Sequence, residues 1–152
     1  MSNQVQLRAA NITDIEWLLG AMREFYAIDE YDFNATTARP ALEKFINDAS
    51  LGRLWVIEYE DKAIGYVALT FSYSFEFHGR DAFVDELFID ADYRGQGVGN
   101  QVMQFIEERS REFGIDALHL EVERTNVAGL ALYKKFGFKD HNRFLMTRWI
   151  SK

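Results

Sequence analysis

Two adjacent carboxylates interrupt an apolar stretch of the sequence, where one of them could act as a general base. The stretch runs Ala82-Phe-Val-Asp-Glu-Leu-Phe-Ile-Asp90, and the two carboxylates are Asp85 and Glu86. Its composition is typical of a β-strand. Successive side chains of a strand point to opposite faces, so only one carboxylate can face a substrate unless a bulge intervenes. The other would then be a carboxylate in a surface ion pair.

A glycine-rich segment follows this strand and precedes a run of residues with helical spacing. Unpaired amides at a helix start, together with the helix dipole, favour a bound anion. Glycine lets the backbone approach a phosphate closely, and Arg94 adds a positive charge at the same place. The segment therefore predicts a pyrophosphate cradle, formed by Arg94, Gly95, Gln96, Gly97, Val98 and Gly99.

Two familiar nucleotide-binding loops do not fit this segment. A Walker A loop ends in Gly-Lys followed by Ser or Thr, and no Lys follows Gly97 or Gly99. A dinucleotide fingerprint needs a further small residue where Asn100 stands, and it belongs to the first strand-helix-strand unit of a chain. An ordinary glycine turn is the remaining alternative, because glycine is common in all proteins.

A second motif follows the glycine segment about thirty residues later, and the two motifs together resemble those of a known family. Arg94-x-x-Gly97-x-Gly99, followed by Asn126, Tyr133 and Gly137-Phe138, resembles the GNAT superfamily of N-acetyltransferases. The match spans about residues 83–138, and the order of the expected elements agrees over the whole chain. The strand and the loop after it look most like the polyamine and diamine branch. Similar strings occur in aminoglycoside and protein acetyltransferases.

The resemblance implies a fold and a co-substrate. The fold would be a mixed α/β GNAT-like one, with a mostly antiparallel sheet of six to seven strands flanked by about four helices. The co-substrate would be acetyl-CoA. Its pantetheine arm would lie against the amides of Leu87, Phe88 and Ile89, and its pyrophosphate in the glycine segment. Asn126 and Tyr133 would line the thioester end.

Acetyl transfer to an amine needs a base and an acid. A primary amine with a pKa near ~10.4 is mostly protonated at pH 7, so its proton must be removed. In the polyamine and aminoglycoside branches the base stands at the place of Asp85, which we favour. Other branches use the place of Glu86. Tyr133 could protonate the departing thiolate, or it could be a core aromatic of an amphipathic helix. Because the chain has no cysteine, we expect direct transfer in a ternary complex.

The acceptor amine is expected to contact the segment between the first two helices. Tyr26, Glu30 and Tyr31 combine aromatic rings with a carboxylate, which suits a cation, and Phe75 could line the other side. A solvated loop would have the same composition. We expect no metal, because His78, His119 and His141 are too scattered for ligand spacing.

The elements needed to position these residues follow from periodicity and capping signals. A capping box at Thr13 and Glu16 would start the first helix, and Thr36 or Thr37 would cap the second. Further helices are expected over 99–113 and 130–136. Strands are expected over 5–9, 54–59, 63–75, 82–90, 117–122 and 143–150.

Composition and charge limit the remaining possibilities. The chain has 152 residues, which predicts one domain over 1–152, and a net charge of −7, which argues against nucleic acid. No run reaches the ~18 apolar residues of a membrane span, and no export signal stands at the start, so a cytoplasmic protein is expected. The apolar residues of 143–150 predict a homodimer, although a buried last strand would use the same residues.

Two alternatives to an enzyme remain. One is an acyl-CoA-binding sensor module without a productive base, and the other is a structural interaction domain.

Overall fold

The computed structural model describes residues 4–151, which divide into two compact units. One unit ends at Glu121 and the other begins at Val122. The expectation of a single domain over 1–152 therefore stays a prediction. None of the helices within residues 4–151 is long and apolar enough to cross a membrane.

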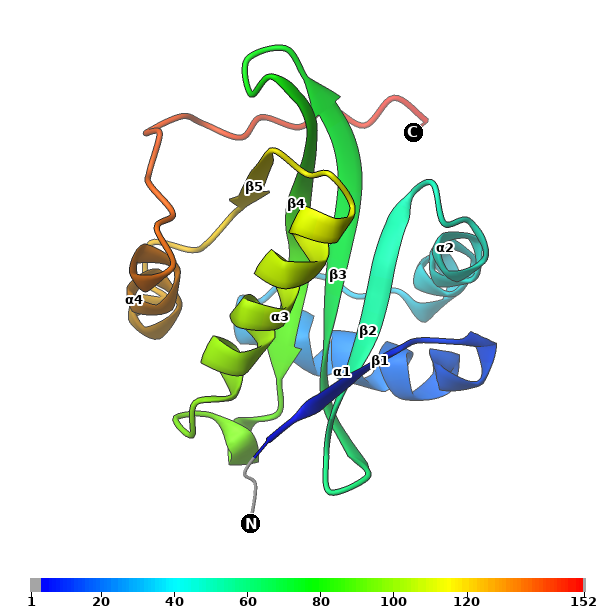
Figure 1. Cartoon of the computed structure of the whole chain (residues 1–152). Helices are drawn as coiled ribbons and strands as arrows, with labels where there is room; N and C mark the ends of the chain where they lie inside the picture. Colours follow the sequence, from blue (N-terminus) through cyan, green and yellow to red (C-terminus); the bar gives the residue numbers. More distant parts are fainter. Residues whose placement is uncertain (1–3, 152) are drawn as a thin grey trace. The chain divides into compact units, whose positions relative to one another are not determined.

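The first unit is built on a five-stranded sheet with the strands in chain order (Figure 1). Three of its four pairings are antiparallel, and the last, between β4 and β5, is parallel. The sheet confirms the expected mixed α/β GNAT-like class. Its strands are β1 (Gln6–Ala9), β2 (Gly52–Tyr59), β3 (Lys62–Ser74), β4 (Gly79–Ile89) and β5 (Ala117–Leu120).

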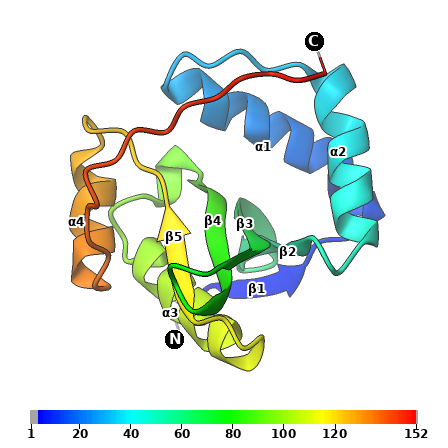
Figure 2. The same cartoon turned by 90° about the horizontal axis from the view of Figure 1, so that it is seen from above.

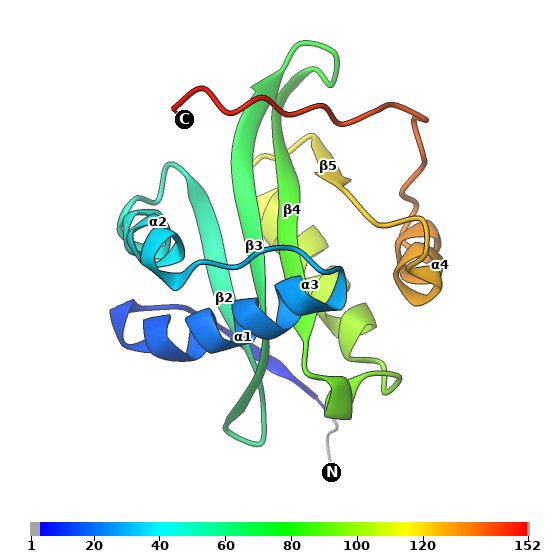
Figure 3. The same ribbon diagram turned by 180° about the vertical axis from the view of Figure 1, so that it is seen from behind.

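Helices cover both faces of this sheet. Two of them, α1 (Ile15–Ile28) and α2 (Ala35–Asn47), lie on one face, and α3 (Val98–Glu112) lies on the other (Figures 2 and 3). Each face has its own apolar cluster, one containing Leu18 and Tyr66 and the other Val102 and Ile106. The sheet is therefore held from both sides, as its two sets of apolar side chains require.

The capping residues of the first two helical segments lie earlier in the chain than the sequence suggested. The capping box at Thr13 and Glu16 is wrong, because Asn11 and Asp14 form the box around a short 3-10 turn, Ile12–Asp14. Asn11 is extended and its side chain accepts from the amide of Thr13. Asn34, not a threonine, likewise caps α2 by accepting from the amide of Thr36. In both places an asparagine, which is a better cap than threonine, stands just before the helix.

The expected last strand is absent, so the sheet has five strands rather than six or seven. Residues 143–150 form no strand, and Phe144 is 90% exposed. Among the described residues, α4 (Val127–Lys135) is the regular element of the second unit. A lone extended segment in that unit has no neighbouring strand to satisfy its backbone groups, so its alternating side chains are not enough to make it a strand.

A β-bulge in β4 changes which side chains face the first two helices. Ala68 of β3 pairs with Glu86 and Leu69 pairs with Val84, so Asp85 is the extra residue. Val84 belongs to the cluster beneath α3, whereas Phe88 belongs to the cluster beneath α1. The bulge therefore reverses the alternation and turns the end of the strand over.

Close contact between β3 and β4 near the bulge predicts that Gly65 tolerates no side chain. A Cβ at Gly65 would lie 2.2 Å from the carbonyl oxygen of Phe88. We expect Gly65→Ala to lower the free energy of unfolding by ~1–3 kcal/mol, as measured by urea denaturation. Gly20→Ala is the control, because a Cβ at Gly20 in α1 meets nothing within 4 Å and alanine favours a helix. Equal losses in the two variants would contradict this close approach.

Candidate active site

The last five residues of β4 form an open edge of the sheet. Parallel pairing with β5 ends at Val84 and Leu120, so beyond that point the described strands leave one side of β4 without a neighbour. The amide of Asp90 donates to the carbonyl oxygen of Ile64 on β3 at 2.7 Å. Backbone groups alternate in direction along a strand, so those of Leu87 and Ile89 point to the open side.

The open edge continues into the glycine segment. Arg94 donates from Nε to the carbonyl oxygen of Ile89 at 2.8 Å, which fixes its guanidinium at the end of the strand. Phe88 differs from its two neighbours, because its side chain is buried in the cluster beneath α1. By the same alternation its amide points toward β3 and is not at the open edge.

The glycine segment leads directly into α3. Gly97 is the N-cap, in the left-handed region with φ 83°, and no side chain caps the helix. The side chain of Val98 is buried and anchors the first turn in the core. Gly95 is also left-handed, with φ 72°. Amides at the start of this 15-residue helix are therefore presented without a side-chain cap, next to Arg94.

Two tyrosine hydroxyls meet the carboxylate of Glu86. Tyr26 of α1 donates to Oε2 at 2.5 Å, and Tyr66 of β3 donates to Oε1 at 2.6 Å. Three elements therefore converge on one side chain beside the open edge. The sequence suggested Tyr26 as an acceptor contact but not Tyr66, which is one of several hydroxyl-bearing residues of β3.

The carboxylate pair has an unusual electrostatic environment. Burial raises the pKa of Glu86, the hydrogen bonds from Tyr26 and Tyr66 lower it, and the charge of Asp85 raises it. Burial also raises the pKa of Asp85. The charge of Asp85 contributes to the raised pKa of both tyrosines, after their burial and their contact with Glu86. The two carboxylates and two hydroxyls therefore form one electrostatically coupled group.

The other residues expected to meet the acceptor lie at the surface. Glu30 has a left-handed backbone with φ 59° and follows Asp29, the C-cap of α1. Tyr31 is 57% exposed, and its amide donates to the carbonyl oxygen of Tyr26 at 2.9 Å. Phe75 is 93% exposed in the turn after β3. Of the four predicted residues, only Tyr26 contacts a member of the carboxylate pair.

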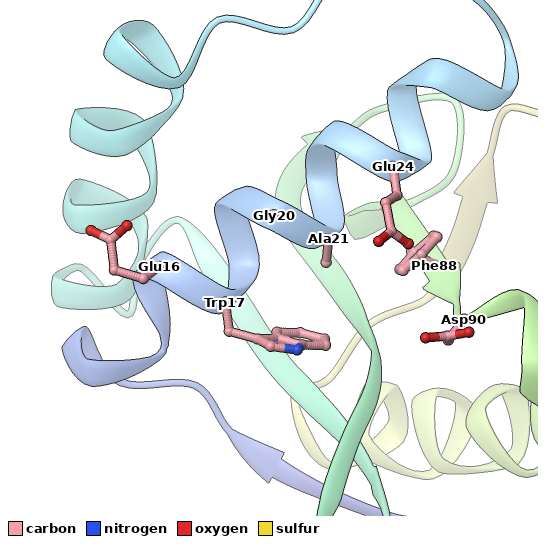
Figure 4. Close-up of a pocket in the computed structure, with 7 residues that line it drawn as sticks. All are labelled: Glu16, Trp17, Gly20, Ala21, Glu24, Phe88 and Asp90. Atoms are coloured by element: carbon pink, nitrogen blue, oxygen red, sulfur yellow. The ribbon is translucent and has the colours of Figure 1, made fainter.

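A groove of about 230 Å³ lies between α1 and the end of β4 (Figure 4). The Trp17 ring and the carboxylates of Glu24 and Asp90 surround it, whereas Glu16 points away to an ion pair with Arg39 at 2.6 Å. The sequence motifs do not predict this groove, although a spacing of three and four residues places several of its members on one stripe of a helix. It is lined by Glu16, Trp17, Gly20, Ala21, Glu24, Phe88 and Asp90.

Asn126 and Tyr133 belong to the second unit. The side chain of Asn126 caps α4 by accepting from the amide of Gly129 at 2.9 Å. Tyr133 lies on α4, where its ring meets that of Phe138 edge to face at 6.0 Å. Burial raises the pKa of Tyr133, so its hydroxyl keeps its proton at neutral pH.

The histidine and carboxylate side chains of residues 4–151 include no group of three that could hold a metal ion. His119 instead contacts the buried Asp81 at 2.9 Å, and Ser72 donates to the other oxygen of Asp81 at 2.5 Å. Asp81 stands between the other two side chains, so histidine cannot activate the serine as a base, and the cluster links β3, β4 and β5.

Curated proteins similar to this chain are N-acetyltransferases. Among curated relatives, the bovine thialysine N-epsilon-acetyltransferase is 32% identical over 77 residues, which cover 51% of this chain and 45% of the relative. The peptidyl-lysine N-acetyltransferase YjaB of Salmonella typhimurium is 30% identical over 111 residues, which cover 72% of this chain and 66% of the relative. The matches thus span about half and about two thirds of these relatives.

Solved structures share the fold across nearly the whole chain. An integron cassette protein from the mobile metagenome of Cole Harbour Salt Marsh has a TM-score of 0.83 at 29% identity, covering 95% of this chain and 90% of that one. An aminoglycoside N-acetyltransferase in complex with CoA has a TM-score of 0.79 at 15% identity, covering 99% and 97%. The model of the acetyltransferase (GNAT) family matches residues 16–138. The chain therefore belongs to the GNAT family of acetyltransferases.

Proposed function

We propose that this acetyltransferase uses acetyl-CoA to acetylate a primary amine by direct transfer within a ternary complex. The observation that carries the proposal is the open edge of β4, which has the carboxylate pair at one end and the glycine segment at the other. An extended pantetheine arm can lie along such an edge as an added strand. The pair and the cradle would then stand at the two ends of one ligand.

Specific backbone groups would hold the co-substrate. The amides of Leu87 and Ile89 and the carbonyl oxygen of Leu87 face the open edge and would bind the pantetheine arm, whereas the carbonyl oxygen of Ile89 accepts from Arg94. Phe88 would contribute packing instead, because its backbone groups are turned toward β3. The amides at the start of α3, with Arg94, would bind the pyrophosphate, since a helix start favours an anion. Gly97 would allow the close approach that this contact needs.

The proton would leave the amine through the carboxylate pair. We assign Asp85 to meet the amine, because no described side chain donates a hydrogen bond to it, whereas both oxygens of Glu86 are occupied by tyrosines. Asp85 takes a proton from the ammonium, and the neutral nitrogen attacks the thioester carbon. The carbon–sulfur bond breaks, and the thiolate takes a proton from Tyr133. The nitrogen loses a second proton as the amide forms, and this proton restores the hydroxyl of Tyr133. The amide and CoA are the products.

The acceptor class is a cationic amine. Candidates are a polyamine, an aminoglycoside-like small amine, and a protein lysine or N-terminus, as the names of the relatives suggest. The net charge of −7 and the carboxylates around the groove beside α1 favour a cation. Glu30, Tyr31 and Phe75 would contact the acceptor from the surface. We place this chemistry in the cytoplasm.

We also propose that the protein is a homodimer. Phe144, Met146, Trp149 and Ile150 are each at least 74% exposed, which is an unusual amount of apolar surface on one short segment. Association of two copies would remove these side chains from water. Sedimentation or light scattering would give the mass of one chain if the proposal is wrong.

Acetyl transfer is measured directly by acceptor-dependent release of CoA thiol. Because the chain has no cysteine, a thiol reagent reports CoA alone. We expect release with at least one acceptor from a panel of polyamines, aminoglycosides and lysine peptides. CoA binding without release for any acceptor would instead indicate an acyl-CoA-binding module.

The cradle predicts that Gly97→Val weakens CoA binding. A β-branched residue does not adopt φ 83°, so the amides at the start of α3 would be turned away from the phosphates. We expect the Kd for CoA in calorimetry to rise at least about tenfold, the equivalent of one lost hydrogen bond to a charged group. Gly114→Val is the control, because Gly114 has φ 71° and equally open surroundings at the other end of α3. Unchanged CoA affinity in a folded Gly97→Val protein would disprove the cradle.

The two carboxylates should differ in their effect on the pH dependence of kcat/KM. Burial raises the pKa of Asp85, so wild-type activity should fall as the pH decreases through that raised value. Asp85→Asn should lose ~10²-fold or more at pH 7 and recover as alkaline pH deprotonates the amine. Glu86→Gln should lose less, and its acidic limb should move to lower pH because a like charge has been removed. The reverse pattern would make Glu86 the base.

Tyr133→Phe should lower kcat while leaving acetyl-CoA affinity nearly unchanged. The ring keeps its packing and only the proton donor is lost, so a general-acid loss of about 10²–10⁴-fold is expected. Tyr59→Phe removes the same atom from a residue of β2 outside the proposed site and should keep the wild-type rate. A Tyr133→Phe enzyme of normal kcat would show that the thiolate leaves without this acid.

A further inference from the structure

In the described part of the chain, the two adjacent carboxylates of β4 have no cation beside them to offset their negative charge. Asp85 and Glu86 are neighbours in the chain, and burial raises the pKa of each. No lysine, arginine or histidine within residues 4–151 forms an ion pair with either of them. The charge of Asp85 acts on Glu86, and interacting like charges favour retention of one proton by the pair. A pair that already holds a proton is a poor acceptor for another.

The hydroxyls of Tyr26 and Tyr66 are the groups that offset this repulsion. Each donates to a different oxygen of Glu86, and hydrogen bonds to a carboxylate favour its ionised form. Tyr66 is only 2% exposed, so water cannot easily replace its hydroxyl if that is removed. The groups that act on Glu86 are therefore these two hydroxyls and the charge of Asp85, from α1, β3 and β4.

We propose that Tyr26 and Tyr66 are positioning residues that keep Glu86 ionised, so that its negative charge makes the neighbouring Asp85 a stronger base for the amine proton. The inference rests on the proposed function and adds a role that the family motifs do not contain. Neither tyrosine exchanges its proton, because both have a raised pKa. Each holds Glu86 in one orientation and one charge state.

Tyr26 also connects Glu86 to the segment between α1 and α2, where the acceptor is expected to bind. Its carbonyl oxygen accepts from the amide of Tyr31, and its ring meets Phe33 edge to face at 5.5 Å. The segment between α1 and α2 is thus tied through one residue to Glu86. Loss of the Tyr26 hydroxyl should therefore raise KM for the acceptor as well, whereas loss of the Tyr66 hydroxyl should not.

The test compares pH profiles of kcat/KM for Tyr66→Phe, Tyr26→Phe and the wild type. Without one donor, Glu86 should take the proton of the pair more readily, so Asp85 would lose the neighbouring charge and the acidic limb should move to lower pH, toward that of Glu86→Gln. In Tyr66→Phe combined with Glu86→Gln, the limb should stay at that of Glu86→Gln alone, because no charge remains at position 86 for the tyrosine to stabilise. Tyr73→Phe is the matched control, since Tyr73 lies on the same strand and is 73% exposed.

A purely structural role of the tyrosines would give a different result. The rate would then fall by one factor at every pH, with a lower Tm and an unmoved acidic limb, and the inference would be wrong. Titration of the Glu86 carboxyl carbon by NMR gives a readout that does not need turnover. Its pKa should be higher in Tyr26→Phe and in Tyr66→Phe than in the wild type, and an unchanged titration would also overturn the inference. If the titration shifts but no acceptor is acetylated, the proposed function fails and the tyrosine contacts stand.

Discussion

One extra residue in β4 determines the layout of the whole site. Asp85 is inserted between residues that pair regularly with β3, and the strand turns over at that point. As a result Glu86 meets hydroxyls from α1 and β3, and Phe88 packs beneath α1. Beyond Val84, β4 also runs without β5 at its side. The bulge thus coincides with the end of one strand pairing and with the start of an open edge, a common association of bulges with functional sites.

The apolar core keeps this arrangement rigid. Val84 is held in the cluster beneath α3 and Phe88 in the cluster beneath α1, so the strand is anchored on opposite faces on either side of the bulge. Val98 is buried as well and fixes the start of α3 relative to β4. Backbone amides placed in this way need no reorganisation to meet an anion or an extended ligand, which is the advantage of building a site on regular elements.

Much of this could be predicted from the sequence, because its local signals are strong. The alternation of β4, the glycines before α3 and the helical stripe of α1 each depend on residues close together in the chain. The tyrosine contacts with Glu86 depend on residues 60 and 20 positions apart, which no local pattern reports. The register shift was equally invisible, since it is a property of two paired strands. The strand expected over residues 143–150 was wrong for the opposite reason. Its local pattern was clear, but alternation describes a strand only where another strand is present to pair with it.

The central claim is that the open edge of β4 binds the pantetheine arm of CoA, and amide hydrogen exchange tests it most directly. The account predicts that the amides of Leu87 and Ile89 exchange rapidly in the free protein and become protected at saturating CoA, because the ligand supplies their missing partners. The amide of Phe88, which points toward β3, should be protected in both states. Amides of Leu87 and Ile89 that remain unprotected with CoA bound would contradict the account, as would amides already protected without it.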